Sequence, residues 1–219
     1  NFINRKYVEF FKIDMSEFAP LQSYASLNAL FTRRLLRPRE IAADETAFIS
    51  PSDGAIFESG CCADLRAFSV KGCEYSLSEL LGRTFTASES GATYAASGVQ
   101  AEIYSDESGA SRETSAIGAQ GGVNLSYANI YLSPRDYHHY HAPCDLSVLQ
   151  ALYIPADLYS VAKKFLLKIP NLYAKNERVI LKCKMRNGGI LWMVFVGALN
   201  VGKMRFDFDT QIQTNACAN

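Results

Sequence analysis

The chain has 219 residues and a formal net charge of +0, because 22 lysines and arginines balance 22 aspartates and glutamates. A chain of this length can bury one sizeable core. The balanced charge excludes a global attraction for nucleic acid, so we expect no nucleic-acid partner. The longest strongly apolar run, residues 190–199, is far shorter than the ~20 residues that span a bilayer. We therefore expect a globular protein without a membrane-spanning segment here.

The first 38 residues have apolar side chains at helical spacing, mixed with arginine and lysine. This pattern predicts one or two amphipathic helices, and Ser26 is placed to cap a helix that begins at Leu27. The basic and aromatic mixture could dock on a membrane surface with its aromatic face in the headgroup zone. The same spacing also fits a helix that packs on the core, and both readings stay open. Pro38 closes this helical region.

From residue 39 to residue 219 the sequence changes to short β-type runs divided by glycine and proline, which predicts a β-rich domain. A short helix over 75–82 is expected to stop at Gly82. Residues from about 83 to 126 are rich in Ser, Ala and Gly, and we expect a long surface excursion there. The fold class is α+β, with N-terminal amphipathic helices followed by a largely antiparallel β-sandwich or barrel-like core. The predicted strands are 48–57 around a Pro-Ser-Asp-Gly turn, 68–72, 127–132, 146–154, 177–183 and 190–201.

All three histidines of the chain, His138, His139 and His141, fall within the stretch 132–143. Imidazole gives and takes protons near neutral pH and also binds metals. Prolines bracket the stretch, which predicts a strand that ends in a shaped turn.

Two chemistries fit this stretch. In a zinc or iron site, His138 and His141 would bind the metal with an oxygen from Asp136 or Asp53. That signal is weak, because residues three apart on a strand point in different directions, and we expect no metal. In proton transfer, Asp53 would orient His141, which would deprotonate a serine or threonine hydroxyl. Asp53 could equally bond its own turn backbone.

Several segments, in this order, resemble the phosphatidylserine decarboxylases of the short bacterial type. Together they cover most of the chain outside the excursion. They are Leu-Asn-Ala-Leu-Phe-Thr-Arg at 27–33, Ser-Pro-Ser-Asp-Gly at 50–54, Lys-Gly-x-x-Tyr-Ser-Leu at 71–77, Leu-Ser-Pro-Arg-Asp-Tyr-His at 132–138, His-Ala-Pro at 141–143, Asn-Leu-Tyr-Ala-Lys-Asn-Glu-Arg-Val at 171–179 and Val-Gly-Ala-Leu-Asn-Val-Gly-Lys at 196–203.

The resemblance implies an enzyme that makes its own cofactor. In the family a serine attacks the preceding glycine carbonyl, and the chain splits to leave a pyruvoyl group on the new N-terminus. By resemblance, His141 is the base of this self-cleavage and Asp53 its partner. The pyruvoyl group then captures the amine of phosphatidylserine as a Schiff base, and loss of carbon dioxide yields phosphatidylethanolamine. His138 resembles the histidine that steadies the substrate carboxylate or reprotonates the product. His139 is expected to be a surface imidazole.

One departure from the family pattern bears on maturation. None of the 14 glycines is followed by serine or threonine, so the pyruvoyl serine is expected outside this chain. The chain then reads as the β-type part, whose partner is a pyruvoyl-bearing α chain. The other readings are a chain that cannot mature, and a non-catalytic lipid-surface binding module with the same fold. The resemblance also implies a homodimer and a peripheral position on the cytoplasmic face of the cell membrane.

Overall fold

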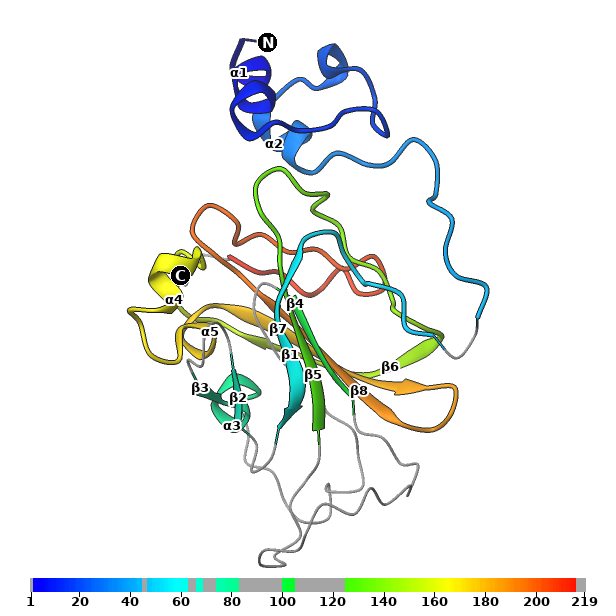
Figure 1. Ribbon diagram of the computed structural model, residues 1–219, viewed down its shortest axis with the longest axis vertical. Helices are drawn as coiled ribbons and strands as arrows, with labels where there is room; N and C mark the ends of the chain where they lie inside the picture. The colour runs from blue at the N-terminus through cyan, green and yellow to red at the C-terminus, as the bar shows by residue number, and fades with distance from the viewer. Residues whose placement is uncertain are drawn as a thin grey trace, which may run out of the picture. The chain divides into compact units, whose positions relative to one another are not determined.

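A computed structural model of the chain describes residues 2–44, 47–62, 66–68, 74–82, 100–104 and 125–215 (Figure 1). The chain divides into two compact units, each made of two segments. The first contains residues 1–55 and 131–145, and the second contains residues 56–130 and 146–219. The histidine stretch therefore belongs to the same unit as the N-terminal helices. The predicted domain boundary between residues 38 and 39 stays a prediction.

The first unit contains helix α1 (Phe2–Phe11), the 3-10 turn η1 (Leu21–Ser23) and helix α2 (Leu27–Phe31). The predicted cap of α2 is confirmed, because Ser26 Oγ accepts a hydrogen bond from the backbone N–H of Ala29 at 3.1 Å. Helix α1 turns the fully buried Asn4 inward, where its side-chain amide donates to the Tyr24 carbonyl at 2.9 Å. This bond ties α1 to the segment that leads into α2.

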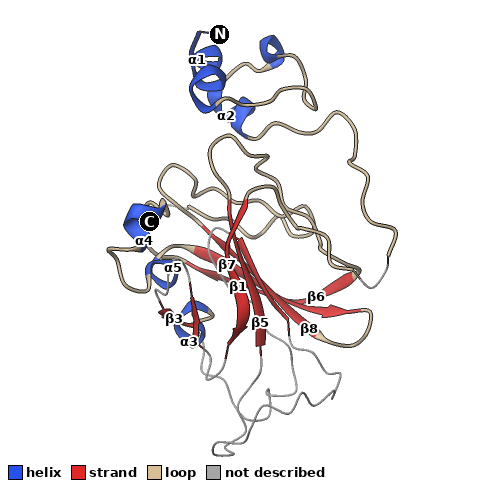
Figure 2. Ribbon diagram, in the orientation of Figure 1, coloured by secondary structure: helices blue, strands red, loops and turns tan. Residues whose placement is uncertain are grey.

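The second unit is built on a six-stranded sheet, drawn as red arrows in Figure 2, with the strand order β1-β5-β4-β8-β7-β6. The pairs β5–β4, β4–β8, β8–β7 and β7–β6 are antiparallel. The predicted α+β class and its largely antiparallel sheet are confirmed. In the described part of the chain this sheet ends at β1 and β6 and does not close into a barrel. The strands are β1 (Ala55–Cys62), β4 (Gln100–Tyr104), β5 (Leu125–Tyr131), β6 (Leu146–Ile154), β7 (Arg178–Met185) and β8 (Ile190–Val196).

Strands β7 and β8 supply much of the core of this unit. Six of the seven residues of β8 are buried, as are six of the eight residues of β7. Such near-continuous apolar runs are typical of strands that are covered on both faces. Strand β6, at the end of the sheet, is largely exposed along its first half. The strands predicted at 127–132, 146–154, 177–183 and 190–201 are therefore confirmed, with shifted ends.

Smaller elements complete the second unit: β2 (Arg66–Phe68), β3 (Glu74–Ser76), α3 (Leu77–Leu80), α4 (Lys163–Leu166) and α5 (Leu172–Lys175). Strands β2 and β3 form an antiparallel pair. The predicted helix stop at Gly82 is confirmed, since its φ of 62° is a backbone conformation that glycine adopts without strain.

Arg178 joins α3, α5 and β7. Its guanidinium donates to the carbonyls of Leu80 at 2.6 Å, Glu79 at 2.9 Å, Ala174 at 2.7 Å and Asn176 at 2.9 Å. Burial lowers the pKa of Arg178 to about 10, which leaves it charged at neutral pH. One cation thus satisfies four carbonyls from two segments, residues 79–80 and 174–176.

Two local predictions need correction. Strand β4 lies inside the stretch expected to be a surface excursion, yet it pairs with both β5 and β8. Main-chain hydrogen bonds to two neighbours define it, whereas its short side-chain pattern gave no signal. Apart from β4 and the first two residues of β5, the excursion lies outside the described residues, as do residues 69–72 of the strand predicted at 68–72. Residues 48–50 form no strand, and β1 begins only after the turn at 51–54. Gly54 in that turn has a φ of 118°.

None of the helices in the described ranges has both the length and the apolar character needed to cross a membrane.

Candidate active site

The histidine stretch leaves β5 and turns immediately. The side chain of Asp136 accepts a hydrogen bond from the Ser133 N–H at 2.6 Å, and the Asp136 N–H donates to the Ser133 carbonyl at 2.9 Å. The hydroxyl of Tyr7 in α1 donates to the carbonyl of Pro134 in the same turn at 3.3 Å. These bonds fix the turn that precedes the histidines, as the bracketing prolines predicted.

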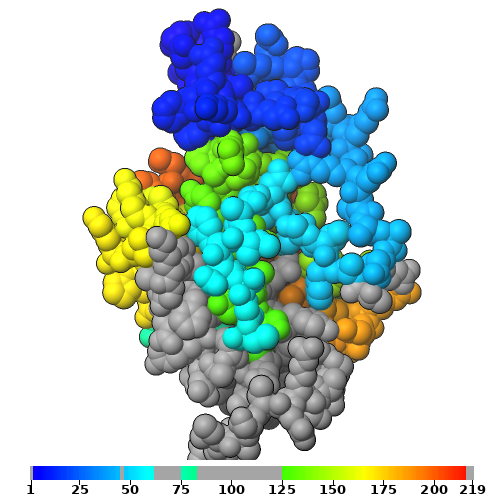
Figure 3. Space-filling view, viewed as in Figure 1, coloured from blue at the N-terminus to red at the C-terminus, as the bar shows by residue number. Residues whose placement is uncertain are grey.

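The end of α2 holds the histidine stretch through three consecutive residues. The ring of Phe31 lies against His138 with 3.9 Å between centroids. The Thr32 carbonyl lies 3.2 Å from His139 Nε2. Arg33 Nη2 donates to the carbonyls of residues 135 and 136, at 2.6 Å and 3.2 Å. In Figures 1 and 3 the N-terminal segment, in blue, accordingly lies against the histidine stretch, in green.

His138 is half-buried, and its Nδ1 lies 2.9 Å from the backbone oxygen of Asp136. A carbonyl oxygen only accepts hydrogen bonds, so the proton of the neutral ring is on Nδ1 and Nε2 carries a lone pair. Burial is the main cause that lowers the pKa of His138 to about 4. At neutral pH this imidazole is therefore an uncharged proton acceptor.

One reading of the sequence expected Asp53 to bond its own turn, but among the described residues its carboxylate has other partners. Its carboxylate accepts hydrogen bonds from both terminal nitrogens of Arg39, and from the Tyr137 N–H at 3.4 Å. Arg39 also binds both carboxylate oxygens of Glu17, at 2.7 Å and 2.9 Å. The hydrogen bonds to these two acids raise the pKa of Arg39, and the bond from Arg39 lowers the pKa of Glu17. One guanidinium thus orients two carboxylates.

His141 is exposed, and its position is set by its backbone and by one aromatic ring. Its N–H donates to the Pro51 carbonyl at 2.7 Å, two residues before Asp53. Its ring stacks on Tyr137 at 5.9 Å between centroids, with 16° between the planes. His139 stacks on Tyr137 as well, at 4.8 Å and 19°. The neighbouring residue His138 contacts Phe31 instead.

Tyr137 therefore brings the two predicted partners near each other, with Asp53 at its backbone N–H and His141 at its ring. In the described residues no hydrogen bond joins the Asp53 carboxylate to the His141 imidazole. Their pairing in catalysis stays a prediction, as does the role of His138. Sequence reasoning missed Tyr137, although an extended segment puts residues 137, 139 and 141 on one side and His138 on the other. It also missed Arg39, for which the sequence carries no local signal.

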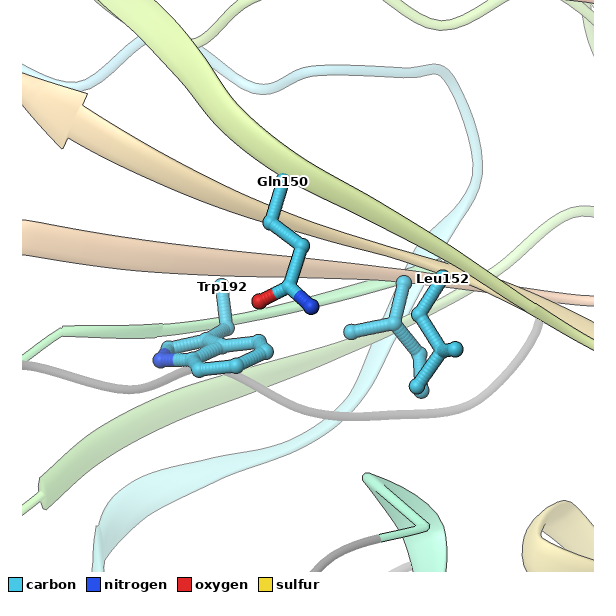
Figure 4. Close-up of a pocket in the computed structure, with 4 residues that line it drawn as sticks. Gln150, Leu152 and Trp192 are labelled. Atoms are coloured by element: carbon cyan, nitrogen blue, oxygen red, sulfur yellow. The ribbon is translucent and has the colours of Figure 1, made fainter.

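A shallow pocket of about 190 Å³ lies in the second unit, on strands β6, β7 and β8, and is lined by Gln150, Leu152, Ile180 and Trp192. Figure 4 shows the amide of Gln150 extending from its strand toward the indole of Trp192, with Leu152 beside them. The volume is below the roughly 300 Å³ at which small-molecule sites begin. None of the predicted catalytic residues lines it.

Taken together, the first unit carries imidazoles and a carboxylate on a braced segment, and the second is a largely antiparallel α+β unit. Imidazoles and carboxylates are side chains that enzymes commonly use for proton transfer. The family model described as phosphatidylserine decarboxylase matches residues 27–216. The chain belongs to the phosphatidylserine decarboxylase family, which confirms the resemblance seen in the sequence.

Relatives from three bacteria illustrate the match, and each is named phosphatidylserine decarboxylase proenzyme. The protein of Campylobacter jejuni is 48% identical over 218 residues, which cover 98% of this chain and 69% of the relative. That of Helicobacter pylori strain 26695 is 44% identical over 216 residues, or 99% of this chain and 68% of the relative. That of Idiomarina loihiensis is 37% identical over 182 residues, or 80% of this chain and 51% of the relative.

Proposed function

We propose that this chain is the β-type part of a pyruvoyl-dependent decarboxylase that converts phosphatidylserine to phosphatidylethanolamine after a precursor cleaves itself. Family membership and the names of the relatives support the decarboxylase and its substrate. The arrangement around Tyr137 is the observation that carries the mechanism. Tyr137 contacts both the Asp53 carboxylate, through its backbone N–H, and the exposed His141 imidazole, through its ring. His138, on the opposite side of the segment, is neutral.

In the self-cleavage step, His141 acts as the general base. Its imidazole is exposed, so a serine hydroxyl of a neighbouring segment can approach it. His141 accepts the hydroxyl proton while the serine oxygen attacks the preceding carbonyl carbon. The peptide C–N bond then breaks, the nitrogen of the serine takes the proton back from His141, and an ester remains. Asp53 stabilises the imidazolium that results, once its carboxylate reaches the ring across Tyr137. Arg39, whose two terminal nitrogens donate to the Asp53 carboxylate, holds that carboxylate close to this position.

The pyruvoyl group is placed on a serine outside this chain, since no glycine here precedes serine or threonine. When bound, its ketone supplies an electron sink for the electron pair that the departing carbon dioxide leaves behind. The groups in this chain fit such a cofactor, because the amine of the substrate must lose a proton before it can react with a ketone. His138 Nε2, with its lone pair, can accept that proton. His138 then returns the proton to the carbon that has lost carbon dioxide.

The proposal includes a peripheral position on the cytoplasmic face of the membrane. Helix α1 buries Asn4 and exposes Phe2 at 65% and Phe10 at 78%. The charged groups of Arg5 and Lys6 lie 5.8 Å and 5.9 Å from the centroid of the Phe2 ring. Aromatic side chains beside cations favour the headgroup zone of an anionic bilayer. The variant Phe2→Ser/Phe10→Ser should sediment less with phosphatidylserine vesicles than the unaltered protein. A matched control is Leu149→Ser, which alters an exposed leucine of β6. Equal binding by all three proteins would contradict a role for α1.

The homodimer is likewise part of the proposal, by resemblance to the family. Sedimentation velocity of the mature protein tests it, and a single species with the mass of one precursor would refute it.

The catalytic roles are tested on the full-length precursor, with splitting followed by gel and intact mass, and decarboxylation followed by release of carbon dioxide. Asp53→Ala and His141→Ala should remain unsplit. His138→Ala should split and then fail to decarboxylate, whereas His139→Ala should do both. Normal splitting of the first two variants would remove Asp53 and His141 from this step. A precursor that binds phosphatidylserine vesicles, never splits and releases no carbon dioxide would favour the binding module instead.

A further inference from the structure

Arg33 is a buried cation that the proposed mechanism has not used. It follows directly after α2, is only 2% exposed, and has the ring of Phe18 at 4.4 Å from its guanidinium carbon. Among the described residues no carboxylate forms an ion pair with it. Its hydrogen bonds go to two backbone carbonyls, those of Arg135 and Asp136. Its Nε and Nη1 atoms are buried without a hydrogen-bond partner.

Burying such a group is unfavourable, because a guanidinium loses its hydration and no anion replaces it. Burial lowers the pKa of Arg33 for the same reason. The cation contact with Phe18 recovers part of this cost. A buried apolar residue would fit the site at lower cost, so the charge and its two carbonyl bonds call for an explanation beyond packing.

The carbonyl of Asp136 connects Arg33 to the proposed catalytic imidazole. It accepts from Arg33 Nη2 at 3.2 Å and from His138 Nδ1 at 2.9 Å. The shorter bond of Arg33, to the Arg135 carbonyl at 2.6 Å, holds the peptide unit that directly precedes the one carrying the Asp136 carbonyl. Phe31, two residues before Arg33, covers the ring of His138.

We propose that Arg33 is a positioning residue for His138, which it fixes through the shared Asp136 carbonyl as the neutral Nδ1–H tautomer with Nε2 as the proton acceptor. The proposal rests on the proposed function, in which that acceptor takes the proton of the substrate amine. It adds a residue that touches neither the substrate nor the imidazole.

The positive charge of Arg33 also favours the neutral form of His138. Besides burial, the charged groups that act on His138 are Arg33 and His139, which oppose its protonation, and the Asp136 carboxylate, which favours it. The hydrogen bond to the Asp136 carbonyl also favours protonation. Removing Arg33 should therefore raise the pKa of His138 from about 4, although burial, the largest cause, would remain.

The test uses the full-length precursor, its matured form and three variants. Arg33→Met removes both charge and donors, Arg33→Lys keeps the charge without the planar fork, and Arg34→Met is a matched control at the exposed neighbouring arginine. We expect Arg33→Met to split normally and to move the acidic limb of kcat/KM upward by about 1 pH unit. Its kcat should fall by about 10-fold or more, with KM nearly unchanged. Arg33→Lys should keep the acidic limb of kcat/KM at its original pH and should have a higher kcat than Arg33→Met. Arg34→Met should match the unaltered enzyme.

A second readout does not depend on activity. The ¹⁵N shifts of His138 report its tautomer and pKa in the precursor, whether or not that precursor decarboxylates phosphatidylserine. An unaltered Nδ1–H tautomer, pKa and pH profile in Arg33→Met would overturn the proposal. If Arg33→Met fails to fold, Arg33→Gln provides the same comparison with a neutral donor. Failure of the unaltered enzyme to release carbon dioxide would refute the proposed function, while the NMR titration would still decide the role of Arg33.

Discussion

His138 should make the stability of the first unit depend on pH between about 6.5 and 4. The ordinary pKa of 6.5 applies to the unfolded chain and about 4 to the folded unit. Between these values the unfolded chain binds more protons, so the folded unit loses stability as the pH falls. The contribution of His138 to the stability of the first unit is complete above pH 6.5 and is lost as the pH falls through 4. The difference of about 2.5 units, at 1.36 kcal/mol each, corresponds to about 3 kcal/mol.

The assay must separate His138 from the carboxylates, which also titrate in acid. Glu17 has a lowered pKa because of its bond from Arg39, so its own contribution disappears at lower pH. Hydrogen exchange of the Leu30 amide, which donates to the Ser26 carbonyl at 3.1 Å in α2, reports the opening of the first unit. We compare the unaltered chain with His138→Gln, which cannot titrate, and with His139→Gln as the matched control.

From pH 7 to pH 4, the opening free energy of the unaltered chain should fall by about 3 kcal/mol relative to that of His138→Gln. The His139→Gln control should retain most of the pH dependence. A direct ¹H titration of the imidazoles adds a second measurement of the pKa. Parallel curves for the unaltered chain and His138→Gln, or a pKa near 6.5 for His138, would refute this reasoning.

Three further predictions concern other parts of the molecule. Arg178→Met should lower the free energy of unfolding of the second unit by more than about 3 kcal/mol, because several buried carbonyls lose a charged donor. Urea denaturation followed by the fluorescence of Trp192 measures this. Leu30→Ala, at a fully buried position of α2, should lower the stability of the first unit by about 2–5 kcal/mol, measured by hydrogen exchange. Arg39→Met should slow self-cleavage of the full-length precursor about 10-fold, measured by gel, because Asp53 loses the group that orients it.

Arg178→Met and Arg39→Met each have a control at an exposed position of the same unit. Lys175→Met should leave the free energy of unfolding of the second unit within about 0.5 kcal/mol of its original value. Arg37→Met should split at the original rate. A destabilisation by Arg178→Met no larger than that of its control would show that the four carbonyls are satisfied in another way. Faster splitting of Arg39→Met would mean that Arg39 restrains Asp53 instead of orienting it.

Local patterns were enough for the elements with strong side-chain signals. The apolar run at 190–199 predicts a strand over 190–201, observed as β8, and Ser26 predicts the start of α2, because each signal acts within a few residues. Strand β4 escaped prediction, since its bonds come from β5 and β8, which follow it in the chain. The open sheet, in place of a closed barrel, also depends on pairing that no single segment encodes.

For the candidate site, the sequence alone determined that three imidazoles share one short segment and, through ordered motifs, that the chain resembles a decarboxylase family. The tertiary structure decided what each imidazole contacts. It put Arg33 on the carbonyl of Asp136, 103 residues away, and it put Arg39 on Asp53. Long-range hydrogen bonds of this kind depend on where the folded backbone places each group, and spacing along the chain carries no trace of that. The neutral state of His138 is likewise a property of its burial in the folded unit.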